Sequence, residues 1–282
     1  MNVTIPEKEK ISKKTIFLYV FDLIICVIAI AIIFGILFLG DDIVNSIFGV
    51  NKITKRSSQE EDELKSAFEQ IFDNSFEIKT ENNVKKIKSD KDIVYTNYSK
   101  SEKQSNYELN VNIPYVNIKS DDVIAFNEEI DRTFKNKAEE VIKYSGSNNI
   151  YSVKYKAYME NNILSLIIYS DLKQGTSAQR VIYETFTYDL KQNKKLTLQE
   201  TLSQFSLKTQ DVQSKINSDI KAEEEKNLDL KNLGYNVFTR DINNSIYKVE
   251  NINEFFVYNG NIYIIFAYGN EQFTSQKDIV VI

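Results

Sequence analysis

The chain has 282 residues, with 35 Lys and Arg against 40 Asp and Glu, and a net charge of −5 at pH 7. This acidic balance makes nucleic acid an improbable partner, because nucleic-acid binding needs a basic surface. Histidine is absent, which excludes Ser-His-Asp and Cys-His catalysis and His-ligated zinc. We therefore expect no enzyme activity, no cofactor and no metal. Carboxylate-pair chemistry of the glycosidase type stays as an alternative, with the candidates Glu160, Asp171, Glu184 and Asp189.

An almost uninterrupted apolar run extends from Ile16 to Leu39, and its only charge is Asp22. Roughly 20 apolar residues suffice to cross a hydrocarbon core about 30 Å thick, so we predict a transmembrane helix at residues 16–40. A cleaved signal peptide is the competing interpretation, but its apolar region is shorter and ends at small residues. We expect Asp22 to lie near the lipid head groups, and a functional intramembrane acid is the alternative.

Lysines cluster in the first 14 residues, while Asp41 and Asp42 follow the apolar run. By the positive-inside rule, residues 1–15 form a cytoplasmic tail and the C-terminal part is extracellular. The single cysteine, Cys26, lies within the apolar run, so the extracellular part has no disulfide, as is usual for Gram-positive bacteria. The predicted location is the cell membrane, crossed once, with the lipid bilayer as a partner.

Residues 41–106 are expected to be a connector. Within it, residues 60–72 place apolar side chains at spacings of three and four, which predicts an amphipathic helix, and residues 73–106 suggest weak strands and loops. The helix either docks onto its own domain or pairs with a sister chain, so the oligomeric state stays open. Its apolar face carries Leu64, Ala67, Phe68, Ile71 and Phe72.

From Tyr107 the strand and helix patterns are clearer. Residues 107–113 alternate as a strand, and Pro114 either ends it or confines it to an edge. A helix from Asp122 to Tyr144 follows, capped by Asp121 or Asp122. Its expected inner face carries Ile124, Phe126, Ile130, Phe134, Ala138, Val141 and Ile142.

The remaining segments predict further strands and helices. Strands at 151–159 and 163–170 are joined in hairpin fashion across Glu160-Asn161-Asn162, a third strand spans 179–188, and the longest helix spans about 209–227. Asn259-Gly260 between two apolar runs predicts a second hairpin, and a last strand covers 278–282. The predicted class is α+β, an antiparallel sheet packed with helices.

These segments resemble a known domain family. The matching residues are LNVNIP at 109–114, the helix at 122–144, ETFTYDL at 184–190, KKLTL at 194–198 and the final hairpin. Over residues 107–282 the chain resembles the extracellular domain of RsiV-type anti-sigma factors, which sense lysozyme, and of PdaC-type peptidoglycan deacetylases. The resemblance implies an α+β domain that binds a ligand of the cell envelope.

The chain departs from these families in two ways. Many relatives have a Gly-Ala-His turn where this sequence reads Gly-Thr-Ser-Ala-Gln at 175–179, so any role of that histidine is absent. Only about 15 residues precede the predicted anchor, whereas anti-sigma factors hold their sigma factor with a longer cytoplasmic segment. The leading hypothesis is therefore a non-enzymatic receptor for a lysozyme-like protein or a peptidoglycan glycan. A membrane-bound anti-sigma-type signalling protein, controlled by regulated proteolysis, is the alternative.

Recognition residues concentrate in loops that a rigid sheet positions. We accordingly expect the ligand to bind near the turn at Gly175 and near the second hairpin. The candidate ligand-binding residues are Gly175, Thr176, Ser177, Gln179, Asn259 and Gly260.

Overall fold

The computed structural model describes residues 56–72, 84–143, 148–269 and 274–282, and all of them belong to the unit Arg56–Ile282. The predicted tail at 1–15 and transmembrane helix at 16–40 lie outside these residues. In the part of the chain that the structure describes, no helix has both the length and the apolar character needed to cross a membrane.

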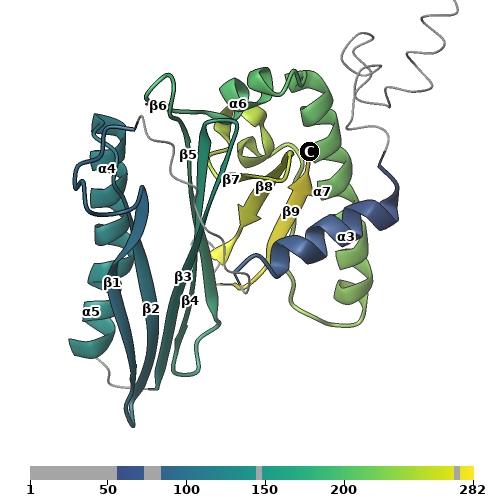
Figure 1. Ribbon diagram of the computed structural model, residues 1–282. Helices are drawn as coiled ribbons and strands as arrows, with labels where there is room; N and C mark the ends of the chain where they lie inside the picture. Colours follow the sequence, from purple (N-terminus) through teal and green to yellow (C-terminus); the bar gives the residue numbers. More distant parts are fainter. Residues whose placement is uncertain (1–55, 73–83, 144–147, 270–273) are drawn as a thin grey trace, which may run out of the picture. The chain divides into compact units, whose positions relative to one another are not determined.

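A six-stranded sheet in the order β1-β2-β3-β4-β5-β6 forms the centre of the unit (Figure 1). The sheet is mixed, because β2 and β3 are parallel while the other neighbours are antiparallel. The expectation of a wholly antiparallel sheet was therefore wrong. A helical crossover between β2 and β3 makes their parallel pairing feasible. The strands are β1 Val94–Lys103, β2 Tyr107–Val116, β3 Asn149–Glu160, β4 Ile163–Gln174, β5 Arg180–Asp189 and β6 Lys194–Lys195.

Strand β2 continues through Pro114, where the sequence pattern suggested an end or an edge. Its pairing with β3 stops at Val111, so beyond that residue only β1 pairs with it. Proline has no backbone N–H to donate and is tolerated where one side of a strand is unpaired. Beside it, β1 has an irregular register between Thr96 and Tyr98.

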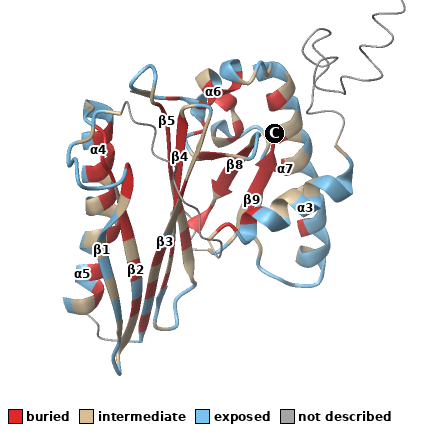
Figure 2. Cartoon of the chain, viewed as in Figure 1, coloured by how far each residue is buried: buried red, intermediate tan, exposed pale blue. Residues whose placement is uncertain are grey.

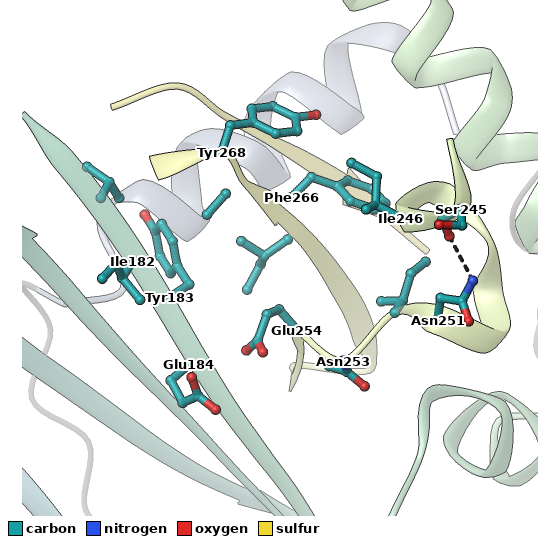
Figure 3. A pocket seen from close by; sticks show the side chains of 14 residues that line it. Ile182, Tyr183, Glu184, Ser245, Ile246, Asn251, Asn253, Glu254, Phe266 and Tyr268 are labelled. Atoms are coloured by element: carbon teal, nitrogen blue, oxygen red, sulfur yellow. Dashed lines mark hydrogen bonds between the residues drawn. The ribbon is translucent and has the colours of Figure 1, made fainter. Parts of the chain in front are cut away.

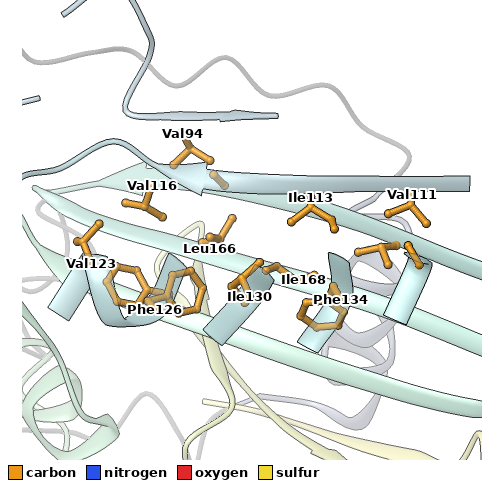
Figure 4. Close-up of a cluster of buried hydrophobic side chains, with 14 of the residues drawn as sticks. Val94, Val111, Ile113, Val116, Val123, Phe126, Ile130, Phe134, Leu166 and Ile168 are labelled. Carbon is orange, nitrogen blue, oxygen red and sulfur yellow. The ribbon is translucent and has the colours of Figure 1, made fainter. Parts of the chain in front are cut away.

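The crossover consists of α4 (Asp121–Ile130), a π-helical turn η2 (Asp131–Lys135) and α5 (Asn136–Lys143). Figure 4 shows its apolar side chains packed on the six-stranded sheet. Two details of the prediction were wrong. Ser120 takes the cap position, without a side-chain hydrogen bond, and Ile124 is 45% exposed while its neighbour Val123 is buried.

A second, antiparallel sheet in the order β7-β8-β9 lies on the other side of the six-stranded sheet (Figure 1). Its strands are β7 Phe255–Tyr258, β8 Asn261–Ala267 and β9 Lys277–Val281. Asn259 and Gly260 form the β7–β8 turn with φ of 50° and 70°, which confirms the hairpin. The β3–β4 hairpin is confirmed as well, with positive φ at Asn161 and Asn162.

Helices cover the outer side of the second sheet. They are α6 (Leu198–Gln204) and α7 (Thr209–Asn232), with the short 3-10 helices η3 (Ser245–Tyr247) and η4 (Val249–Asn251), whereas α3 (Ser58–Glu69) packs against both sheets. A capping box formed by Ser57 and Glu60 starts α3, and Phe68 and Ile71 are buried against both sheets. The amphipathic helix expected at 60–72 therefore docks onto its own domain.

Buried residues follow both sheets, while the outer faces of the helices are exposed (Figure 2). One apolar cluster lies between the crossover helices and the six-stranded sheet, and another lies between the two sheets and α3. The compact unit begins at Arg56 and includes β1 and α3.

Candidate functional site

The two loops singled out in the sequence lie at opposite ends of β4. The N–H of Gly175 donates to the carbonyl of Asn148 at one end of the sheet. At the other end, Asn259 accepts from Tyr158 Oη at 2.9 Å, and the N–H of Gly260 donates to Glu160 at 3.0 Å. Twelve strand residues span about 40 Å. The structure therefore does not bring these two loops together into one site.

Gln179 lines a cavity. Its 540 Å³ cavity lies between the start of β5, the segment after α7 and the approach to β9, whereas Thr176 and Ser177 are exposed in the neighbouring turn. The side chains that line it in the described residues carry no charge and are mostly amides and hydroxyls. We call it the neutral cavity: Ala178, Gln179, Asn236, Val237, Phe238, Thr239, Thr274, Ser275 and Gln276.

A second cavity, of 440 Å³, lies between β5 and β8 (Figure 3). We call it the acidic cavity, because Glu184 of β5 and Glu254, just before β7, both line it. The two carboxyl groups point toward one another (Figure 3). At one end Gly269 lies against β5, where an added Cβ would come within 2.2 Å of the Val181 carbonyl oxygen. Only glycine allows this approach of the two backbones.

The two cavities share a wall. Phe238 lines the neutral cavity and Tyr268 lines the acidic one, and their rings stack with centroids 3.9 Å apart. Behind them the guanidinium of Arg240 donates two hydrogen bonds to Asp278, at 2.5 and 2.7 Å. Tyr268 also donates to Asp278, and Tyr247 is bonded to Tyr268. This network holds the segment after α7 on the second sheet.

The pKa values of both glutamates in the acidic cavity are raised. Burial, and then the nearby charge of Glu184, raise the pKa of Glu254 to about 8. Burial also raises the pKa of Glu184, with a further contribution from Glu129, while Lys195 acts in the opposite direction. Glu254 therefore holds a proton at neutral pH, although a glutamate in water does not.

Glu184 was among the candidate carboxylates chosen from the sequence, whereas Glu254 was not. Glu160, Asp171 and Asp189 do not line this cavity, and Asp189 instead accepts from the N–H groups of its own turn. Nothing in the pattern around Glu254 distinguishes it from the other acidic residues, because its burial depends on the distant strand β5. Among the described residues no cluster of three or more acids, cysteines or histidines could hold a metal ion.

A scan against protein-family models gives no match, and no curated protein matches this sequence. Among solved structures, a DUF3298 family protein from Pseudomonas aeruginosa PAO1 is similar, with 9% sequence identity, a TM-score of 0.39 and coverage of 66% of this chain and 85% of that chain. A member of the same family from Bacteroides fragilis NCTC 9343 shows 13% identity, a TM-score of 0.34 and coverage of 62% and 81%. The chain is thus structurally similar, at low sequence identity, to proteins of the DUF3298 family, a domain found in RsiV- and PdaC-type proteins.

Proposed function

We propose that this chain is a non-enzymatic, single-pass membrane protein whose extracellular domain binds a ligand of the cell envelope. We further propose that the ligand is the glycan of peptidoglycan and that it occupies the neutral cavity. The observation that carries the proposal is an uncharged, hydrogen-bonding lining around Gln179, one of the residues chosen from the sequence.

The chemistry of the neutral cavity suits a sugar. Amide and hydroxyl side chains both donate and accept hydrogen bonds, as sugar hydroxyls do, and they impose no net charge on the ligand. The cavity volume of 540 Å³ is within the range of about 300–1,000 Å³ typical of small-ligand pockets. Tyr235 directly precedes the lining residue Asn236 and is 63% exposed, so its ring is available to stack on a sugar face.

Binding is tested with the full chain in detergent micelles and purified, insoluble peptidoglycan. We expect the wild type to sediment with the polymer, and Gln179→Ala and Tyr235→Ala each to weaken binding about tenfold, or about 1.4 kcal/mol. Ser177→Ala is the matched control, because Ser177 is exposed in the adjacent turn outside the lining. Absence of retention, or equal loss in the control, would contradict the proposal.

A lysozyme-like protein is the second candidate ligand, and the acidic cavity together with the net charge of −5 favours it. Opposite charge on two partners speeds their encounter and helps select the partner. Immobilised lysozyme should then retain the full chain in a salt-dependent manner. If retention is the same for an uncharged protein of similar size, this candidate is rejected.

The membrane anchor at residues 16–40 and the extracellular location of the domain are part of the proposal. They are supported by the apolar run from Ile16 to Leu39. Protease added to intact cells should degrade the domain and spare the tail at 1–15. The anti-sigma-type alternative is supported instead if a sigma factor co-purifies with that tail.

A further inference from the structure

The acidic cavity contains an unsatisfied buried acid. Oε2 of Glu254 is inaccessible to solvent and has no hydrogen-bond partner. Hydrogen bonds from the side chain and backbone of Thr185 to this carboxyl group act against the rise in its pKa, and the same hydroxyl also contacts the carbonyl of Asn253 and the N–H of Phe255. Buried polar groups are almost always paired, so Oε2 of Glu254 lacks a partner that the described residues do not supply.

The charged groups around the pair compensate it only in part. Glu129 of α4 adds negative charge from the crossover side. Lys195 of β6 is the nearby cation, but its ammonium lies 5.9 Å from the ring of Phe186 and forms no ion pair with either glutamate among the described residues. When both glutamates are ionised, the cavity therefore has an excess of negative charge that a cation could neutralise.

The rest of the lining combines apolar and polar side chains. Ile246 and Phe266 line the same cavity as the two carboxyl groups (Figure 3). Such a wall matches the methylene stem of a lysine or arginine side chain, whose charged head then meets the acids. A bare metal ion fits less well, because it takes six or more oxygen ligands and no cluster of three acids is present in the described residues.

We propose that the acidic cavity is a binding site for an organic cation, an alkylguanidinium or alkylammonium group, held between Glu184 and Glu254. The guanidinium form is favoured, since its planar fork can donate to both carboxylates at once. The cation site and the glycan site in the neutral cavity consist of different residues. An experiment can therefore reject one of the two proposals without rejecting the other.

Binding should release a proton. Glu254 is protonated below its pKa of about 8, and the cation binds the ionised form. Affinity therefore rises with pH, by about 50-fold from pH 6 to pH 8, and levels off above the pKa, because the ionised fraction rises in that proportion. A guanidinium stays charged throughout this range, so the change reports on the protein.

The experiment is calorimetric titration of the full chain with methylguanidinium, compared with methylurea, which has a similar shape and no charge. We expect saturable binding of methylguanidinium alone, with proton uptake by the buffer. Glu254→Gln should weaken binding at least tenfold and remove its pH dependence, and Glu184→Gln should weaken it comparably. Glu225→Gln, an exposed acid of α7, is the control.

Equal binding of methylurea, or pH-independent binding by the wild type, would overturn the proposal even if a variant failed to fold. Two further probes identify the source of the cation. Loss of lysozyme binding in Glu254→Gln indicates a protein side chain, and unchanged lysozyme binding with lost methylguanidinium binding indicates a small molecule. Retention on peptidoglycan, measured with the same variants, should not change.

Discussion

The neutral and acidic cavities are neighbours with opposite chemistry. One is lined by uncharged amides and hydroxyls, the other by two carboxyl groups, and the stack of Phe238 on Tyr268 separates them. The polar groups of the neutral cavity can form hydrogen bonds with water or a ligand. The two carboxyl groups of the acidic cavity, in contrast, repel one another in the folded state when both are ionised. We propose on this basis that they are two independent binding sites that share one structural wall.

The wall itself contains buried charges that are compensated. Arg240 and Asp278 have side chains that are each only 5% exposed, and they form a bidentate ion pair. Glu184 and Glu254 have no such partner among the described residues. Buried charges are normally paired, so the first pair is part of the structural framework and the second is a candidate for ligand binding.

The largest effect on stability is expected from breaking the buried ion pair between Arg240 and Asp278. Asp278→Asn leaves the buried Arg240 without its counter-charge, so the free energy of unfolding should fall by about 3–5 kcal/mol. Urea denaturation of the full chain measures this change. Both cavities should lose their ligands in parallel.

The matched control is Lys103→Met, which breaks an ion pair with Glu108 in which the lysine side chain is 77% exposed. It should cost less than about 1 kcal/mol. If Asp278→Asn were as mild as this control, the wall would not be the structural element that we describe.

A smaller and pH-dependent effect is expected from Glu254→Gln. The pKa of Glu254 is raised from 4.5 to about 8 in the folded protein, so the folded state binds the proton more tightly than the unfolded state. The wild type therefore loses stability as pH rises from about 4.5 to 8, by a few kcal/mol. The glutamine variant should lack this component of the loss.

Urea midpoints at pH 5 and pH 8 provide the measurement. A wild type and a variant that change equally between these two pH values would show that Glu254 ionises freely. The contrast between the two cavities would then disappear.

Much of this fold was predictable from local patterns. Asn259-Gly260 and Asn161-Asn162 determine hairpins because their residues tolerate positive φ, and the spacing of Phe68 and Ile71 indicates a helix face. The parallel pairing of β2 with β3 was missed, although the helix between them is the usual signal for it. Glu254 was not predictable, because only the distant strand β5 buries it.

The shared wall can be weakened without removing a charge. Phe238→Leu removes the ring that stacks on Tyr268, which should cost about 1–1.5 kcal/mol in stability. Glycan affinity should fall, because Phe238 lines the neutral cavity, while the carboxyl titration of Glu254, followed by ¹³C NMR, should stay unchanged. A change in the pKa of Glu254 in this variant would show that the two cavities are coupled.

The smallest effect is expected away from both cavities. Gly260 has φ of 70° and open space around its Cα, so Gly260→Ala meets only backbone strain, about 1 kcal/mol. Thermal unfolding measures the loss. Binding to peptidoglycan and to methylguanidinium should be intact, and a loss of either would return this turn to the list of binding loops.

The most direct test of the account is sedimentation of the full chain with purified peptidoglycan, for the wild type, Gln179→Ala and Glu254→Gln. We predict retention of the wild type, about tenfold weaker binding for Gln179→Ala, and no change for Glu254→Gln. Failure of the wild type to sediment, or an effect of Glu254→Gln equal to that of Gln179→Ala, would contradict the assignment of the glycan to the neutral cavity.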